Sequence, residues 1–285
     1  IPSTIKTIGD NAFTNCSLLK EIIIPSSVKY IGTYVFSDCS SLTEITIPSS
    51  VTKINDYDFY KCISLKQVTF ENPNSITSIG GGAFSHCFKL KEITISSSVT
   101  SIRDYAFNKC QSLKQITIPP FISLIRWSCF AGCSSLEQFT IPSSVNSIKS
   151  YAFSDCKSLK EIIIPCSVTE IGDYVFHGCS SLKNIEISSS LTSIGSNAFE
   201  NCSSLEQLII PSSVTEIGGC AFEGCTLLTK ITLPSSITKI DYYWFYKCFA
   251  LKQISIPSSV QSIEWNSFEY CSSLTDVLFQ NPSNL

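Results

Sequence analysis

The chain has 285 residues, of which 44% are hydrophobic and 15% are charged, and its formal net charge at pH 7 is -3. A weakly acidic chain without a basic patch does not fit a nucleic-acid-binding protein, so we expect no nucleic-acid partner. No apolar run approaches the roughly 20 residues that a membrane-spanning helix needs, so we expect no membrane insertion by this segment.

The sequence repeats itself with a period of 23 residues, as arrays of stacked structural units do. Each copy has a cysteine with phenylalanine three residues before it, isoleucine eight residues before it and leucine three residues after it. We call these the ladder cysteines: Cys16, Cys39, Cys62, Cys87, Cys110, Cys133, Cys156, Cys179, Cys202, Cys225, Cys248 and Cys271. Ten of the eleven intervals are 23 residues, and the interval from Cys62 to Cys87 is 25 because Asn72-Pro73-Asn74 lengthens one turn.

This spacing predicts a single array over residues 1–285, with about twelve 23-residue repeats and no domain boundary inside it. One copy alone cannot bury enough apolar surface to be stable. Neighbouring copies must therefore stack, so that their leucine, isoleucine, phenylalanine and cysteine side chains form continuous buried columns. Because the sequence begins and stops inside a repeat, we expect it to be a fragment of a longer protein.

One copy, residues 97–119, shows the predicted elements in chain order. Residues 99–102 predict a short extended segment. In several other copies glycine follows this segment, as at Gly80, and we expect it to take backbone angles that other residues avoid. Phe107 and Cys110 lie three residues apart, so a single helical or 3-10 turn would direct both side chains into the core.

The last element of the copy is a strand. Leu113, Ile116 and Ile118 are separated by polar residues, and the final alternation has the period of a half-buried strand. Pro119 ends the strand because proline has no backbone N–H to continue a ladder. Each copy is therefore predicted to be one coil made of an extended segment, a turn and a strand.

The repeated motif resembles that of a known family. The strand reads Leu-x-x-Ile-x-Ile, and the motif I-P-S-S-V-T-x-I-G-x-x-A-F-x-x-C-x-S-L resembles the BspA-like leucine-rich repeats of oral and gut bacteria and of protists such as trichomonads. The resemblance covers the whole chain, although serine mostly replaces the Asn or Cys that usually follows the strand. It implies a leucine-rich-repeat solenoid of the α/β horseshoe class, mostly β with short 3-10 or helical turns.

The resemblance also implies a function. Such repeats occur in surface or secreted proteins associated with adhesion, so we predict a non-enzymatic adhesin located at the cell surface or secreted. Its partner would be a protein of host cells or extracellular matrix, another microbe, or a glycan, bound through the repeat surface. The alternative is an intracellular protein-binding scaffold.

Fifteen cysteines raise the question of disulfide bonds. Ladder cysteines on stacked coils would point in parallel into the core, which does not meet the torsion of a disulfide, so we expect buried, reduced thiols. Of the other three, Cys129 occupies a core slot, Cys166 replaces an exposed turn serine, and Cys220 stands where tyrosine is usual. No cysteine pair has zinc-ligand spacing. Reduced thiols suit a reducing compartment, in tension with the surface location that the resemblance implies.

The sequence predicts no catalytic, cofactor-binding or metal-binding residues. The two histidines, His86 and His177, lie beside ladder cysteines in copies four apart, so they cannot serve one nucleophile together. We expect both to be solvated turn residues and the protein not to be an enzyme.

Candidate partner-binding residues are those that interrupt the repeated columns. Near the C-terminal end five aromatic residues do so: Tyr242, Tyr243, Tyr246, Trp265 and Tyr270. Exposed tyrosine and tryptophan are typical anchors of protein interfaces. The alternative is local repacking around Trp244, which fills a slot that usually holds alanine.

Apolar residues also interrupt the outward-facing column of the predicted strands. Threonine is the commonest residue of that column, but isoleucine occupies it at Ile163 and Ile209. Because strand faces of solenoids are common binding surfaces, we include both isoleucines among the candidate partner-binding residues.

Overall fold

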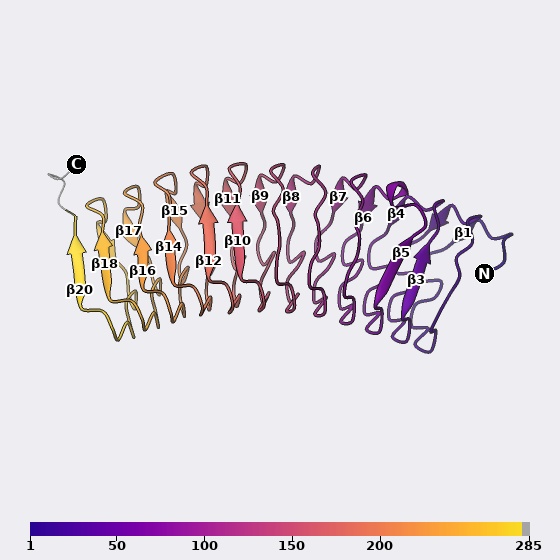
Figure 1. The fold of residues 1–285 in the computed structure, drawn as a ribbon, viewed down its shortest axis with the longest axis horizontal. Helices are drawn as coiled ribbons and strands as arrows, with labels where there is room; N and C mark the ends of the chain where they lie inside the picture. The colour runs from indigo at the N-terminus through magenta and orange to yellow at the C-terminus, as the bar shows by residue number, and fades with distance from the viewer. Residues whose placement is uncertain (281–285) are drawn as a thin grey trace. The chain divides into compact units, whose positions relative to one another are not determined.

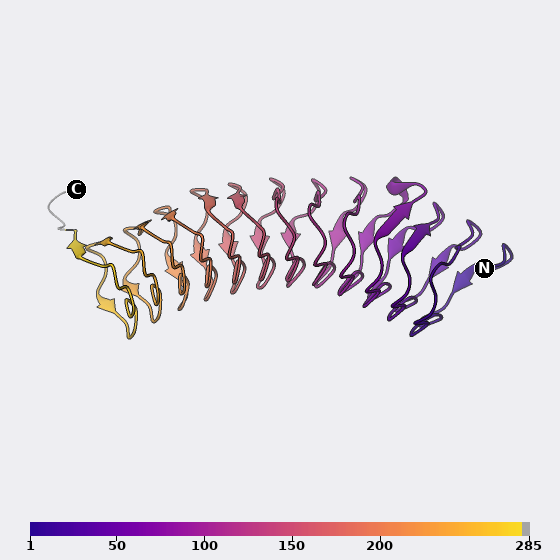
Figure 2. The same cartoon turned by 60° about the horizontal axis from the view of Figure 1, so that its bottom comes forward.

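The computed structural model describes residues 1–280, which form two compact units, unit 1 (residues 1–144) and unit 2 (from residue 145). Each unit is a β-solenoid whose coils take about 23 residues and contribute up to two strands (Figures 1 and 2). The predicted solenoid of about twelve repeats is therefore confirmed. The prediction of one uninterrupted array over residues 1–285 stays a prediction.

The coils contain short strands of two residues and long strands of three or four residues. The short strands of unit 1 are β1 (Thr7–Ile8), β2 (Tyr30–Ile31), β4 (Lys53–Ile54), β6 (Ser78–Ile79), β7 (Ser101–Ile102) and β8 (Leu124–Ile125). Its long strands are β3 (Glu44–Ile47) and β5 (Gln67–Phe70). The short strands of unit 2 are β9 (Ser147–Ile148), β11 (Glu170–Ile171), β13 (Ser193–Ile194), β15 (Glu216–Ile217), β17 (Lys239–Ile240) and β19 (Ser262–Ile263). Its long strands are β10 (Glu161–Ile164), β12 (Asn184–Ile187), β14 (Gln207–Ile209), β16 (Lys230–Thr232), β18 (Gln253–Ile256) and β20 (Asp276–Phe279).

Strands of neighbouring coils pair in parallel, with a register equal to the repeat length. Glu44 of β3 lies opposite Gln67 of β5, and in unit 2 Glu161 of β10 lies opposite Asn184 of β12. Equivalent side chains of successive coils therefore lie side by side. Within β3 the isoleucines are buried and the polar residues are exposed, as the alternation of the sequence predicts.

The core consists of columns of identical side chains. Rings of the phenylalanine column are stacked on one another: Phe84 and Phe107 have centroids 5.5 Å apart and planes 10° apart, and Phe176 and Phe199 are 5.5 Å and 15° apart. These rings are fully buried, and the leucine and isoleucine columns lie beside them. Because the same residue recurs at each slot, equivalent side chains stack on one another.

Besides the two sets of strands, the segment before most ladder cysteines connects neighbouring coils through backbone hydrogen bonds. In one copy three alternate residues donate backbone N–H groups to carbonyls of the next coil, over 2.9, 2.9 and 2.6 Å: Tyr105, Phe107 and Lys109. The residues that follow each of them donate within the coil, to the carbonyl three residues back, over 3.3, 3.0 and 3.1 Å: Ala106, Asn108 and Cys110. Consecutive N–H groups thus bond alternately to the next coil and to their own.

This alternation requires left-handed backbone at two slots of every copy. The residue five before the ladder cysteine and the residue one before it both have positive φ, for example 60° at Tyr105 and 58° at Lys109. Asparagine, aspartate and glycine, which tolerate positive φ, occupy several of these slots. Tyrosine and lysine occupy others, so the inter-coil hydrogen bonds must outweigh a local cost of about 1 kcal/mol each.

The predicted single turn between phenylalanine and cysteine is present and directs both side chains into the core, but it is not part of a helix. The N–H of Cys110 does bond to the carbonyl of Phe107, but the positive φ of Lys109 makes this a turn that cannot continue as a helix. Within residues 1–280 the only helix is η1 (Pro73–Ser75), in the lengthened turn, and no helix there is long and apolar enough to cross a membrane.

The role expected for glycine after the extended segment also needs correction. Gly80 does not have positive φ. A Cβ atom on Gly80 would instead lie 2.4 Å from the carbonyl carbon of Asn55 in the preceding coil. Glycine is favoured at this position because two backbones approach closely, and the left-handed residues are elsewhere in the turn.

The ladder cysteines are free thiols, and most of them donate a hydrogen bond to a backbone carbonyl of the preceding coil. Cys62 Sγ donates to the carbonyl of Phe36 over 3.1 Å, and Cys110 Sγ donates to that of Phe84 over 3.2 Å. Burial raises the pKa of these thiols well above the usual value, so they stay protonated and can donate. The expectation of buried thiols is confirmed for ten of the twelve ladder cysteines and for Cys129, whereas Cys16 and Cys271 are only partly buried. Cys166 is exposed as expected.

This distribution of thiols predicts how the folded protein reacts with a thiol reagent. We expect Cys166 to be labelled rapidly, and Cys16, Cys220 and Cys271 more slowly, because these three are only partly buried. The other eleven thiols should react only after unfolding. Mass spectrometry after a short pulse of maleimide checks this, and rapid labelling of all fifteen cysteines would contradict the described core.

One buried residue departs from the columns and should make unit 1 sensitive to pH. Asp58 is 2% exposed and occupies a slot that holds Val35 and Ala83 in the neighbouring coils. Its carboxylate accepts hydrogen bonds from the N–H groups of Asn55, at 2.7 Å, and Val35, at 3.4 Å. Burial outweighs both bonds and raises the pKa of Asp58 to about 7.

We predict that Asp58→Ala stabilises the protein at pH 8 and has little effect at pH 4. The folded-state pKa lies above the unfolded value, so the folded chain binds more protons and stability falls as pH rises from about 4 to 7. The rise of the Asp58 pKa to about 7 corresponds to a loss of stability of roughly 4 kcal/mol at most. Thermal unfolding at pH 4, 6 and 8 measures the effect, with the exposed Glu21→Ala as control. An equal change at pH 4 and pH 8 would contradict it.

Candidate functional site

The five aromatic residues singled out near the C-terminal end form one connected group in unit 2, which we call the unit 2 aromatic cluster. Tyr242 stacks on Trp265 with centroids 5.4 Å apart, and Tyr243 meets the same Trp265 edge-on at 4.8 Å. Tyr243 also contacts Tyr246 edge-on at 4.9 Å, and Tyr246 contacts Tyr270 at 5.4 Å. The structure thus brings together residues from two successive coils.

The left-handed turns direct these rings outward. Tyr243 and Tyr270 both have positive φ. Tyr243 occupies the left-handed slot five residues before its ladder cysteine, and Tyr270 occupies the one directly before its own. Tyr242 packs over Gly219 of the preceding coil, where a Cβ atom would come within 2.2 Å of the ring. Trp265 and Tyr270 are 59% and 57% exposed, whereas Tyr243 and Tyr246 are half-buried.

Trp244 fills the alanine slot, as its position in the repeat predicts. It is fully buried, and its Nε1–H donates to the carbonyl of Gly218 over 2.8 Å. Its ring contacts Phe222 and Phe245 of the phenylalanine column edge-on. The exposed cluster and the buried tryptophan are therefore adjacent but face opposite ways, toward solvent and toward the core.

A second aromatic cluster lies in unit 1, and the sequence reasoning missed it. Tyr34 stacks on Tyr57 at 4.8 Å, Tyr57 meets Tyr60 edge-on at 5.6 Å, and Tyr60 meets His86 at 5.5 Å. Lys61 Nζ lies 5.1 Å from the centre of the Tyr60 ring. We call these five residues the unit 1 aromatic cluster.

The two clusters share one local arrangement. In unit 2, Lys247 Nζ lies 4.9 Å from the Tyr246 ring, as Lys61 does from Tyr60 in unit 1. The signal that could have found the first cluster is the spacing Tyr-x-x-Tyr-Lys-Cys, which ends at Cys62 and again at Cys248. Each unit therefore presents a pair of perpendicular tyrosine rings with an ammonium group over one of them.

The two candidate isoleucines lie elsewhere. Ile163 on β10 and Ile209 on β14 are 61% and 71% exposed, as expected for outward strand positions. Glu186 of β12 lies opposite Ile163, so the two isoleucines do not form a continuous apolar patch. They belong to the long strands, whereas the aromatic cluster belongs to the turns.

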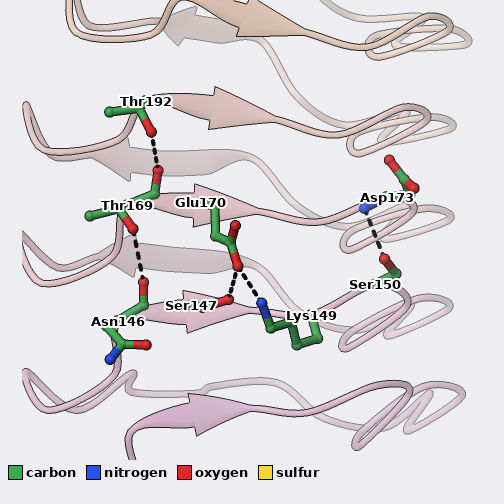
Figure 3. Close-up of polar contacts among 8 residues, drawn as sticks. All are labelled: Asn146, Ser147, Lys149, Ser150, Thr169, Glu170, Asp173 and Thr192. Atoms are coloured by element: carbon green, nitrogen blue, oxygen red, sulfur yellow. Dashed lines mark hydrogen bonds and ion pairs between the residues drawn. The ribbon is translucent and has the colours of Figure 1, made fainter.

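The outer face of the short strands is polar, and its side chains form hydrogen bonds with one another and with the backbone of neighbouring coils (Figure 3). Glu170 of β11 accepts hydrogen bonds from Ser147 Oγ of β9, at 2.5 Å, and from Lys149 Nζ. The bond from Lys149, helped by that from Ser147, lowers the pKa of Glu170. This carboxylate stays ionised, and its hydrogen bonds are made to Ser147 and Lys149 of the protein itself.

Side chains at the ends of these strands also bond from coil to coil (Figure 3). Thr169 Oγ1 donates to the carbonyl of Asn146 over 3.4 Å, and Thr192 Oγ1 donates to that of Thr169 over 2.9 Å. The N–H of Asp173 donates to Ser150 Oγ over 3.2 Å. Much of the polar capacity of this face therefore stabilises the stack.

The histidines are paired rather than simply solvated, which corrects the expectation for them. His177 Nδ1 lies 3.0 Å from Glu200, and this hydrogen bond raises the pKa of the imidazole. His86 Nδ1 lies 2.9 Å from Ser85 Oγ, and burial lowers its pKa. Among residues 1–280 no cluster of His, Cys, Asp and Glu has the geometry to hold a metal ion.

Cys220, which stands in a tyrosine slot, lies near the acidic residues of this part of unit 2. Burial, together with the nearby Glu223, raises the pKa of its thiol to about 12. A thiol with such a pKa is protonated at neutral pH and is a weak nucleophile.

Comparison with known proteins shows which proteins the chain is similar to. The model of the BspA type leucine rich repeat region matches residues 1–114, 59–183 and 192–285. No curated protein sequence matches the chain.

Three solved structures show the same architecture. A leucine rich cell surface protein from Faecalibacterium prausnitzii A2-165 is 28% identical, with 98% of this chain and 84% of that one covered and a TM-score of 0.61. A leucine-rich repeat protein from Bacteroides ovatus ATCC 8483 is 30% identical, with coverages of 97% and 88% and a TM-score of 0.54. One from Eubacterium ventriosum ATCC 27560 is 26% identical, with coverages of 93% and 85% and a TM-score of 0.60.

Proposed function

Because the chain belongs to the BspA-type leucine-rich repeat family, we propose that it is a surface or secreted adhesin without enzymatic activity. Its partner is a protein of host cells, extracellular matrix or another microbe. The similar structures include a bacterial cell-surface protein, which supports this location. The observation that carries the proposal is the pair of aromatic clusters, which place several partly exposed rings side by side at the surface.

The chemistry of the clusters favours a protein partner. Tyrosine and tryptophan are enriched at the energetic centres of protein interfaces, because each combines a large apolar surface with a polar tip. Trp265 and Tyr270 offer this combination on an exposed face, next to half-buried rings that hold them in place. Rings that are fixed before binding lose little conformational entropy when a partner covers them.

The unit 1 aromatic cluster extends the same argument. Tyr57, Tyr60 and Lys61 repeat the contacts of Tyr243, Tyr246 and Lys247. Two similar patches on one chain would bind a repetitive or multivalent partner with higher avidity than either patch alone.

A second candidate function, an intracellular protein-binding scaffold, is favoured by one observation. All fifteen cysteines are free thiols, and most of them are buried. Proteins of oxidising compartments usually pair such cysteines, whereas reducing compartments keep them free. The aromatic clusters would then bind an intracellular protein.

We predict that the double variant Tyr242→Ser, Trp265→Ser weakens binding to intact epithelial cells or immobilised matrix protein by at least tenfold. Removing two anchors from a packed interface costs more than about 1.4 kcal/mol, which is a tenfold change in affinity. The control is Phe121→Ser, an exposed aromatic residue outside both clusters. Unchanged affinity of the double variant would count against the cluster as a binding site.

Location separates the two candidate functions. For an adhesin we expect antibodies to stain the surface of intact producer cells. Staining that requires permeabilised cells, together with no binding to host material, would support the intracellular scaffold instead.

A further inference from the structure

The long-strand side of unit 1 contains a hollow of about 710 Å³, which we call the unit 1 hollow. Three successive coils line it, each through side chains at the start of its strand segment. One coil contributes Ser112, Lys114 and Gln115, which stand two, four and five residues after the ladder cysteine. The neighbouring coils contribute Lys91, Ser135 and Gln138 from the same slots, together with two glutamates.

The hollow lies where the ladder of long strands is interrupted. After β5, residues 92–95, 115–118 and 138–141 form no strand, and a single bridge joins Gln115 to Gln138. The interruption begins directly after the lengthened turn that contains η1. The lining side chains therefore stand over backbone that is less tightly paired than that of β3 and β5.

Unit 2 has a hollow at the same slots, which is independent evidence that the repeat builds this feature. It measures about 270 Å³ and is lined by serine, lysine and asparagine or glutamate of successive coils. Ser181, Lys183 and Asn184 occupy the positions that Ser112, Lys114 and Gln115 occupy in unit 1.

The lining of both hollows is entirely polar. It supplies hydroxyl, ammonium and amide donors together with amide and carboxylate acceptors, and no aromatic or aliphatic residue contributes. Among residues 1–280 no ion pair joins Lys91, Lys114 or Lys183 to a carboxylate. Protein interfaces depend on apolar and aromatic anchors at their centres, so this surface suits a ligand rich in hydroxyl and carboxylate groups.

The spacing of the lining residues favours an extended polymer of a particular repeat. Equivalent side chains on successive paired coils are separated by about 4.8 Å. An extended peptide advances about 3.3 Å per residue, so side chains on one of its faces recur at roughly 6.6 Å and lose step with the coils. A sugar unit of an extended polysaccharide has nearly the same length as the separation between neighbouring coils, so each coil can contact one sugar.

From these observations we propose that the unit 1 and unit 2 hollows bind an extended acidic polysaccharide. The lysines pair with its carboxylates, and the serine and amide side chains bond to its hydroxyl groups. The inference rests on the proposed function, because it assigns a second class of ligand to the same adhesin. The proposed polysaccharide sites lie on the strand side of the coils, whereas the aromatic clusters lie on the turns.

The test measures binding of the purified chain to immobilised alginate, a polymer of uronic acids. We expect saturable binding that weakens at least tenfold in the double variant Lys91→Ala, Lys114→Ala, and also in Ser112→Ala, Gln115→Ala, which leaves the charge unchanged. The matched control is Lys20→Ala, Lys252→Ala, since these lysines occupy the same slot but line neither hollow. Thermal unfolding of each variant confirms that it is folded.

Three results would overturn the proposal. The first is no saturable binding to alginate. The second is equal weakening by the control pair, which would mean that charge alone attracts the polymer. The third is equal affinity for polyglutamate or for a neutral β-glucan, because a site that reads both carboxylates and hydroxyls should prefer alginate to either.

Variants also separate this proposal from the proposed function. Tyr242→Ser, Trp265→Ser should leave binding to alginate unchanged, and Lys91→Ala, Lys114→Ala should leave binding to the protein partner unchanged. Loss of alginate binding in the aromatic variant would overturn the assignment to the hollows, without bearing on the adhesin function.

Discussion

Each coil depends on hydrogen bonds that its neighbour completes. In the segment before most ladder cysteines, alternate N–H groups bond to the next coil and the others close turns within their own coil. Two residues per copy accept left-handed backbone to make this possible, including bulky ones such as Tyr105 and Lys109. The local cost is recovered only when the adjacent carbonyls are in register, so this alternation fixes the spacing of the coils, and the phenylalanine and cysteine columns follow from it.

The same arrangement separates stability from surface chemistry. Backbone ladders, ring columns and thiol-to-carbonyl bonds hold the stack, so outward slots can vary without loss of the fold. The chain uses this freedom differently on different sides. Turns carry the aromatic clusters, the short strands carry polar groups that bond to one another, and the strand side carries two hollows lined only by polar side chains.

The sequence predicts the features that each copy repeats. The period gives the coils, the columns and the burial of the ladder cysteines, because those depend only on identical residues meeting across one repeat length. The sequence predicts the turn before each ladder cysteine less well. The partners of Tyr105, Phe107 and Lys109 are carbonyls 22 residues away, and a pattern of three residues within one copy suggests a helix instead. Gly80 was misread for the same reason, since its constraint comes from the coil before it.

Candidate sites were predicted where several unusual residues are close in sequence. Tyr242, Tyr243 and Tyr246 stand together, and Trp265 lies one period later, so their contacts could be anticipated. The unit 1 aromatic cluster consists of residues that each look ordinary in their own copy, and only comparison with a copy far along the chain reveals it. The unit 1 hollow lies where strand pairing is interrupted, whereas the unit 2 hollow lies over the paired strands β10 and β12. The residues of a single copy therefore do not mark where a hollow forms.

The alternating hydrogen bonds also bear on how such a gene can change. A deletion or duplication of a whole 23-residue copy leaves every inter-coil carbonyl with an equivalent donor, because the slots of all copies match. Unequal recombination between copies can therefore lengthen, shorten or reshuffle the protein while the product still folds. New combinations of exposed tyrosines and lysines arise in single genetic steps, which favours rapid diversification of the surface under selection by a changing partner.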